Sequence, residues 1–351
     1  MAHPGETGIP VFRVENLAAY TPAETIEIVS RAGVKKGNMR SDKVFLSAVS
    51  AGCLLSFAAA SALSTNTAPW FQENAPGLIR SAGAIIFPFG LVMIVYVYIK
   101  LVFLEMLVTM LINFSLTGAD LCTGTFMYTT VTVLHGRLSI WRMLLHWFLC
   151  FWGNLAGSLF VVAIIFGYGG TFDTDPYKSE VQSFVTKKQI TPQFHMIFLR
   201  GIGCNWLVCL ACFFGMQGKD LASKILGIWW PIFAFVSLGL DHVVANMFFI
   251  PLGIWQHTPG LTVGLYIWKG IIPAGLGNII GGALFCGGYY WWMYLFQEPP
   301  VKVDGLTYEP YEEVRGVTLH FRRPQRDTER GLNGKTGDEE VRGPEETVLG
   351  G

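Results

Sequence analysis

The stretch VSLGLDHVVANMFFIP, residues 236–251, places two ionisable side chains, Asp241 and His242, inside a long apolar region. Ionisable residues within a membrane span are costly, and they usually face a water-filled path or a partner. A glycine just before the pair and a proline beyond it allow the helix to unwind, which is tolerated at that depth only where the backbone lines a cavity. The stretch therefore predicts a broken membrane helix at a cavity. The alternative is a pair that merely bonds to neighbouring helices.

The second half of this broken helix is expected to begin near Val243. Its free backbone N–H groups and the positive end of its dipole would then point into the cavity, an arrangement that favours a bound anion.

The composition agrees with a membrane protein. Charged residues make up 14% of the chain and hydrophobic residues 52%, whereas soluble domains carry about 25% charged residues. A span needs about 20 mostly apolar residues. We expect an all-α membrane protein with six spans, although the second apolar region is too long for one. The regions are residues 44–64, 82–134, 143–167, 194–214, 225–254 and 263–296.

Charged residues gather in two tails and in short connectors. Lys and Arg are concentrated in the tails and in the connectors that share their side, so the positive-inside bias places both termini in the cytoplasm. We find no cleavable secretory signal pattern. Thr21 followed by Glu24 predicts a short amphipathic helix from Thr21 to Arg31. The predicted organisation is an N-terminal tail 1–43, a transmembrane domain 44–296 and a charged, mobile C-terminal tail 297–351.

The cysteines do not indicate a disulfide framework. All seven lie in apolar segments, where thiols behave as small buried hydrophobes. Cys209 and Cys212 form a C-x-x-C without a second ligand pair, which is typical of packing rather than metal binding. We expect no metal, cofactor or nucleic-acid partner.

The two halves of the chain repeat each other. Two spans share a Gly-x-Asp, two share a Gly-Asn-x-x-Gly, and two share a Gly-Cys. Three spans followed by three similar spans must be oppositely oriented, which is the inverted-repeat plan of many transporters. The glycines at four-residue spacing are typical of close helix packing in lipid. The pairs are 118–120 with 239–241, 153–157 with 277–281, and 52–53 with 203–204.

The spacing of these pairs predicts an insertion in the first half. The offsets between matching motifs become similar if about 20 residues are removed between Cys53 and Gly118. The candidate is Tyr96 to Ser115, which makes the second region too long and carries Lys100 in an apolar setting. The alternative is a seventh span, which would move the C-terminal tail outside and break the charge bias.

Several motifs in order resemble the formate/nitrite transporter family over about Thr21 to Phe296, and most closely its nitrite transporters of filamentous fungi. The resemblance implies an aquaporin-like six-helix protomer with broken second and fifth helices and its own pore, assembled as a homopentamer in the plasma membrane. The motifs are FPFGL (87–91), GADLCTG (118–124), GNLAGS (153–158), RGIGCNWLVCLA (200–211), LDHVVANMFFIPLG (240–253) and KGIIPAGLGNIIGG (269–282).

The resemblance also implies roles for particular residues. His242 resembles the central pore histidine and Asp241 the acid beside it, while Thr123 and Asn205 resemble polar pore residues and Lys188 an entrance cation. The hydrophobic constrictions are similar to Phe87, Leu91 and Cys122 in one half and to Val208 and Phe235 in the other. Cys122 departs from the bulky aromatic residue common at that position.

The expected function is transport of nitrite, coupled to protons and serving nitrate assimilation. The resemblance suggests that the anion is protonated near His242, because a neutral acid crosses an apolar constriction at less cost than an ion. The alternative is a transporter of formate or another small monocarboxylate. A membrane-embedded hydrolase would need a second deep histidine paired with a carboxylate, and we expect none. A water channel is disfavoured because the paired Asn-Pro-Ala signature is absent.

Overall fold

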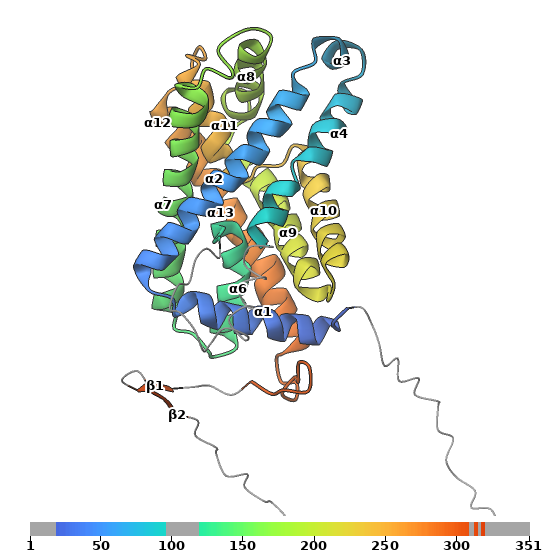
Figure 1. Ribbon diagram of the computed structural model, residues 1–351, viewed down its shortest axis with the longest axis vertical. Helices are drawn as coiled ribbons and strands as arrows, with labels where there is room; N and C mark the ends of the chain where they lie inside the picture. Colours follow the sequence, from blue (N-terminus) through green and yellow to red (C-terminus); the bar gives the residue numbers. More distant parts are fainter. Residues whose placement is uncertain (1–18, 96–118, 309–311, 315–316, 320–351) are drawn as a thin grey trace, which may run out of the picture. The chain divides into compact units, whose positions relative to one another are not determined.

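The computed structural model describes residues 19–95, 119–308, 312–314 and 317–319 (Figure 1). The chain divides into two units, residues 1–308 and residues 309–351. In the second unit, β1 (Glu312–Val314) pairs with β2 (Val317–Leu319) in antiparallel register. The predicted insertion at Tyr96 to Ser115 lies outside the described residues, as does most of the predicted C-terminal tail.

The first unit is helical throughout its described residues apart from turns and isolated bridges. The helices are α1 (Pro22–Gly37), α2 (Ser41–Asn66), α3 (Pro69–Asn74), α4 (Pro76–Ile86), α6 (Cys122–Leu134), α7 (Ile140–Phe160), α8 (Tyr177–Val185), α9 (Phe194–Gln217), α10 (Leu221–Leu238), α11 (Val243–Trp255), α12 (Val263–Tyr266), α13 (Ile272–Ile279) and α14 (Tyr289–Tyr294). Wider π-helical turns occur at η1 (Val161–Gly167), η2 (Thr186–Ile190), η3 (Ile267–Ile271) and η4 (Ile280–Gly288).

Six helical stretches of the described residues are long and apolar enough to span a membrane, which confirms the predicted number. The second begins at Pro76 rather than 82, so Arg80 lies in a helix and not in a connector as expected. The fifth region is divided at residues 239–242, as predicted, and α11 begins at Val243. The stretches are Ser41–Asn66, Pro76–Val95, Ile140–Gly167, Phe194–Gln217, Leu221–Leu238 and Val263–Tyr294.

The two halves of the chain have matching contacts. Helix α2 packs along α7 and against α4 in the first half, and α9 packs along α13 and against α10 in the second. The short helix after each break packs on helices of the other half. Helix α11 packs on α7 and α2, while α6 packs on η4 and α9. Figure 1 shows α6 and α11 as short helices within the bundle formed by the longer ones. Each half therefore supplies one broken helix to a shared interior.

The repeated glycines bring these helices into backbone contact. A methyl group added to Gly157 of α7 would lie 2.1 Å from the carbonyl oxygen of Val49, and one added to Gly281 of η4 would lie 2.3 Å from that of Ile202. Backbone atoms cannot yield like flexible side chains. The close packing of α2 with α7, and of α9 with α13 and η4, therefore depends on glycine at these positions.

The described ends of the first unit lie at the same face of the bundle. Helix α1 has the Thr21 and Glu24 capping box, and it runs to Gly37. The Tyr20 hydroxyl donates to the Asp304 carboxylate at 2.8 Å, joining the segment before α1 to the segment after α14. Burial, together with this carboxylate, raises the pKa of Tyr20 to about 12. Both segments therefore emerge on one side, as an even number of spans requires.

Candidate functional site

The second broken helix turns at Gly239 and resumes at Val243. Gly239 has φ +69°, a left-handed conformation that glycine adopts without strain. His242 caps α11, and its Nδ1 accepts the backbone N–H of Ala245 at 3.0 Å. The local sequence thus ends one half-helix with a glycine and starts the next with a polar cap.

Two asparagines fix the breaks, one in each half. Asn278 donates to the carbonyl oxygens of Gly201 and Asp241 and accepts the Val243 N–H. Asn154 makes the equivalent bonds in the first half, donating to the carbonyls of Ala48 and Asp120 and accepting the Cys122 N–H. Both side chains are fully buried. Each asparagine therefore satisfies the backbone groups that the break leaves unpaired.

Our sequence interpretation missed these asparagines, because it assigned the Gly-Asn-x-x-Gly motif to glycine packing alone. The signal was present: the asparagine is repeated at the same place in both halves, and a buried amide needs partners. A search for backbone groups left unpaired at the breaks would have selected it.

His242 lies between the two halves. Its Nε2 is 3.0 Å from Thr123 Oγ1 of α6, and its ring stacks on Phe235 with centroids 5.8 Å apart and planes at 24°. Because Nδ1 accepts a backbone N–H, it carries the lone pair, and the ring is neutral with its proton on Nε2. The Nε2–H is therefore directed at Thr123, and adding a proton at Nδ1 would break the α11 cap.

Asn205 connects the same two breaks. Its amide donates to the backbone carbonyls of Thr123 at 3.0 Å and Asn278 at 2.6 Å. Its side-chain oxygen is buried and accepts no hydrogen bond from the described residues. Asn205 thus contacts Thr123, which in turn contacts His242, and the free Asn205 oxygen is available to a donor.

Asp241 faces Lys188 rather than His242. The Asp241 carboxylate is fully buried and pairs with Lys188 Nζ at 2.9 Å, and it also accepts the Asn246 amide at 3.2 Å. Lys188 Nζ donates in addition to the Leu240 carbonyl at 2.9 Å. The lysine thereby compensates the buried charge and satisfies a backbone carbonyl in the break that follows α10.

A cavity of about 540 Å³ reaches this side of the break. Four of the predicted residues line it, namely Phe87, Lys188, Phe235 and His242. The two phenylalanine rings meet edge to face with centroids 5.7 Å apart. Leu91, Cys122 and Val208 are buried and do not line this cavity. Its charged lining residues are Arg80, Glu180, Lys187, Lys188 and Arg200.

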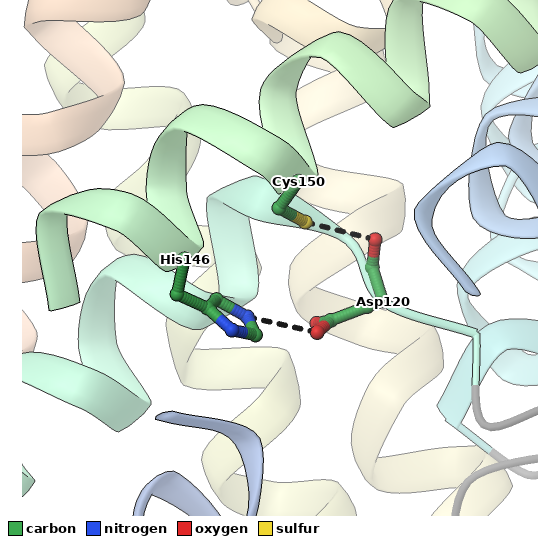
Figure 2. A group of neighbouring side chains, drawn as sticks. All are labelled: Asp120, His146 and Cys150. Carbon is green, nitrogen blue, oxygen red and sulfur yellow. Dashed lines mark hydrogen bonds and ion pairs between the residues drawn. The ribbon is translucent and has the colours of Figure 1, made fainter. Parts of the chain in front are cut away.

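The break in the first half, at Asp120 just before α6, is called the first break. Like the second break at residues 239–242, it has a lysine and a histidine nearby. Asp120 Oδ1 pairs with Lys36 Nζ of α1 at 2.7 Å, which parallels the Asp241 and Lys188 pair of the other half. Asp120 Oδ2 lies 2.9 Å from Nε2 of His146 on α7 (Figure 2). The expectation that no other deep histidine meets a carboxylate was wrong. The missed signal was contact between separate helices, which sequence spacing does not report.

An all-helical membrane protein whose inverted halves join broken helices around buried polar groups belongs, by class, to the channels and transporters. A model of the family described as formate/nitrite transporter matches residues 23–292. The probable formate transporter of Methanothermobacter thermautotrophicus is 33% identical over 289 residues, covering 78% of this chain and 97% of that protein.

Solved structures agree with this assignment. An FNT family ion channel has a TM-score of 0.64 at 25% identity, covering 77% of this chain and 98% of that one. A pentameric formate channel with formate bound has a TM-score of 0.59 at 26% identity, covering 73% and 98%. The chain belongs to the formate/nitrite transporter family. It is therefore a multi-pass membrane transport protein and not an enzyme.

Proposed function

We propose that each protomer carries a small monovalent anion through its own pore, past His242. The observation that supports this most directly is the position of His242, whose Nε2 lies beside Thr123 where the two broken helices meet, at a cavity that several cations line. In this proposal the free Asn205 oxygen and the start of α11 complete the polar centre. The Phe87 and Phe235 rings form the outer constriction.

The charges suggest how the anion moves. Arg80, Lys187, Lys188 and Arg200 give the cavity a positive potential that raises the local anion concentration. Between the phenylalanine rings the anion would lose water at a cost of several kcal/mol. A weak acid avoids that cost by crossing in its neutral form, so we propose that protonation occurs near His242. Net transport is then symport with a proton.

The substrate is proposed to be nitrite, and formate is a second candidate. The motif resemblance to nitrite transporters of filamentous fungi, which none of the reported comparisons supports, is the ground for nitrite and a role in nitrate assimilation. The similar archaeal protein and the similar pentameric channel reported above are named for formate. Both anions are small, planar and monovalent.

The test is competition for uptake by cells that lack other transporters of either anion. If nitrite is the substrate, we expect excess formate to reduce labelled nitrite uptake less than an equal excess of unlabelled nitrite does. Equal inhibition by both would indicate a general monocarboxylate transporter. No uptake of either anion above that of cells lacking the protein would refute the proposal.

A homopentamer in the plasma membrane with both tails in the cytoplasm is proposed on similar grounds. One of the similar solved structures is a pentameric formate channel. The bundle exposes large apolar side chains, among them Trp141, Phe148 and Trp152 of α7, which suit lipid or a neighbouring protomer.

We also propose that Tyr96 to Ser115 is an insertion into the first break, arising from a retained intron or a spliced isoform. In the second half, only residues 239–242 separate α10 from α11. In the first half, Val95 ends the apolar stretch and Cys122 begins α6. Sequencing transcripts across the codons for residues 90–120 tests this, and transcripts that all retain the segment would contradict an intron.

Glu180 is expected to make anion affinity depend on pH. It lines the cavity, and burial raises the pKa of its carboxyl above the ordinary 4.5, although the Gln72 amide and Lys187 oppose the shift. As the pH falls through this raised pKa, the cavity loses a negative charge. The KM for the anion should therefore fall, by up to about fivefold. Glu180→Gln should have the lower KM throughout.

The matched control for this prediction is Glu73→Gln, which neutralises an exposed carboxylate next to Gln72, the residue whose amide donates to Glu180. It should keep the wild-type dependence of KM on pH. If Glu180→Gln also kept that dependence, the predicted role of Glu180 would be wrong.

A further inference from the structure

Three side chains with metal-binding atoms meet at the first break. Asp120 comes from the break itself, while His146 and Cys150 lie one turn apart on the same face of α7 (Figure 2). A carboxylate oxygen, an imidazole nitrogen and the sulfur all lie within 4.8 Å of one another. At most 3% of each residue is exposed. This is the only group of its kind among the described residues.

The bonds within the structure leave this cluster incompletely satisfied. His146 Nε2 and Asp120 Oδ2 lie 2.9 Å apart, yet neither atom has a hydrogen-bond partner among the described residues. His146 Nδ1 has none either. Cys150 Sγ lies 3.1 Å from the Asp120 backbone carbonyl. Buried polar atoms are normally paired, so two features require an explanation: the Nδ1 atom has no partner, and the close contact between Nε2 and Oδ2 lacks the geometry of a hydrogen bond.

We propose that Asp120 Oδ2, His146 Nε2 and Cys150 Sγ form a binding site for a divalent cation of the zinc class. Carboxylate, imidazole and thiolate are the ligands that Zn²⁺ takes, and residues four apart on a helix present two of them on one face. The Cys150 thiol releases its proton to water as the S–metal bond forms. Water fills the fourth position.

The second half of the protein supplies an internal comparison. Asp241 occupies the place of Asp120 and pairs with Lys188 as Asp120 pairs with Lys36. Among the described residues, Asp241 is not part of a group of His, Cys, Asp or Glu side chains that could hold a metal ion. Asn246 donates to Asp241 instead, and a positively polarised amide N–H repels a cation. The proposed metal site is thus specific to the first break. The equivalent break at Asp241 lacks it and serves as an internal comparison.

A cation bound at this site would hold Asp120, and with it the first break, against α7. The cation would share the Asp120 carboxylate with Lys36, weakening that pair, and it would tie residue 120 to the helix on which Asn154 also lies. A break held in one arrangement cannot adjust to passing substrate. Micromolar cation is therefore expected to inhibit anion uptake, which gives the site a regulatory effect without any role in the transport step.

The test measures Cd²⁺ binding to the purified full-length protein by the ultraviolet charge-transfer band of cadmium thiolate. The wild type should bind Cd²⁺ through thiolate with a stoichiometry of one per chain, and Zn²⁺ should displace it. Cys150→Ser should lose the band, and His146→Asn should weaken binding at least about tenfold. Cys204→Ser, which alters a buried cysteine outside the group, should bind as the wild type does.

This readout does not depend on whether the protein transports nitrite, formate or neither, so failure of the proposed function would leave it intact. The elution volume of each variant in detergent establishes that it is folded. The site is refuted if folded Cys150→Ser keeps the band, or if Cys204→Ser loses it equally. It is also refuted if His146→Asn binds as tightly as the wild type.

Discussion

Replacing His242 by Asn is expected to reduce anion transport on the order of 100-fold or more while leaving the protein folded. Asparagine is a good helix N-cap, so it can still accept the Ala245 N–H that His242 Nδ1 accepts. It lacks the Nε2–H that faces Thr123, and it lacks the ring that stacks on Phe235. Groups that assist proton transfer contribute about 10²–10⁴-fold. Uptake of labelled anion, normalised to protein in the membrane, measures the effect.

Two further variants separate function from folding. His257→Asn alters an exposed histidine with φ +54°, a conformation that asparagine tolerates, and it should transport as the wild type does. His242→Ala removes both the cap and the Nε2–H, so it should lose transport and also some stability. Wild-type uptake by His242→Asn would show that the Nε2–H is not needed.

Asn278→Asp is expected to cause a large loss of stability. The asparagine donates two hydrogen bonds, to the Gly201 and Asp241 carbonyls, and both would become contacts between acceptors. The new carboxylate would be buried with only the Val243 N–H as donor. An uncompensated buried charge costs about 3–5 kcal/mol. We expect a large fall in the thermal unfolding midpoint in detergent, or failure to accumulate in the membrane.

Two further variants test this prediction, one at the equivalent asparagine of the first half and one at an exposed asparagine. Asn154→Asp should be destabilised to a similar degree, because its amide makes the equivalent bonds at the other break. Asn38→Asp should be far less destabilised. It also loses an amide donor, to the Val34 carbonyl, but at an exposed position where water can replace that bond, and its Oδ1 still accepts from Arg142. If Asn278→Asp unfolded at the wild-type midpoint, these asparagines would not be what fixes the breaks.

The broken helix could be predicted because the sequence marks it with local signals. A glycine, an acid and a histidine inside an apolar region are costly unless they line a cavity, and the same signals recur near Asp120. The number of spans, the inverted repeat and the start of α11 follow from them. The close packing at Gly157 and Gly281 likewise follows from small residues at four-residue spacing.

What the sequence could not give is contact between helices far apart in the chain. Lys36 and His146 reach Asp120 from α1 and α7, and neither has a spacing that identifies its partner. The direction of Asp241 was also hidden. It adjoins His242 in sequence, but residues at a break point in different directions, and its carboxylate turns to Lys188.

The start of the second span shows a different limit. Residues 76–81 of α4 include Gly77 and Arg80, which read as a polar connector. The helix nevertheless extends through them because Pro76 stands in its first turn, where proline is favoured, and because Arg80 lies over Gly239 beside the cavity. A charge that borders a water-filled space does not end a span.

The central claim is that this chain carries a small monovalent anion past His242, and reconstitution tests it most directly. Liposomes that contain the purified protein should take up labelled nitrite or formate faster when a proton gradient is directed inward. Liposomes with the His242→Asn protein should take it up no faster than protein-free liposomes. Equal flux through the wild type and through correctly inserted His242→Asn, or flux from neither anion in the wild type, would contradict the account.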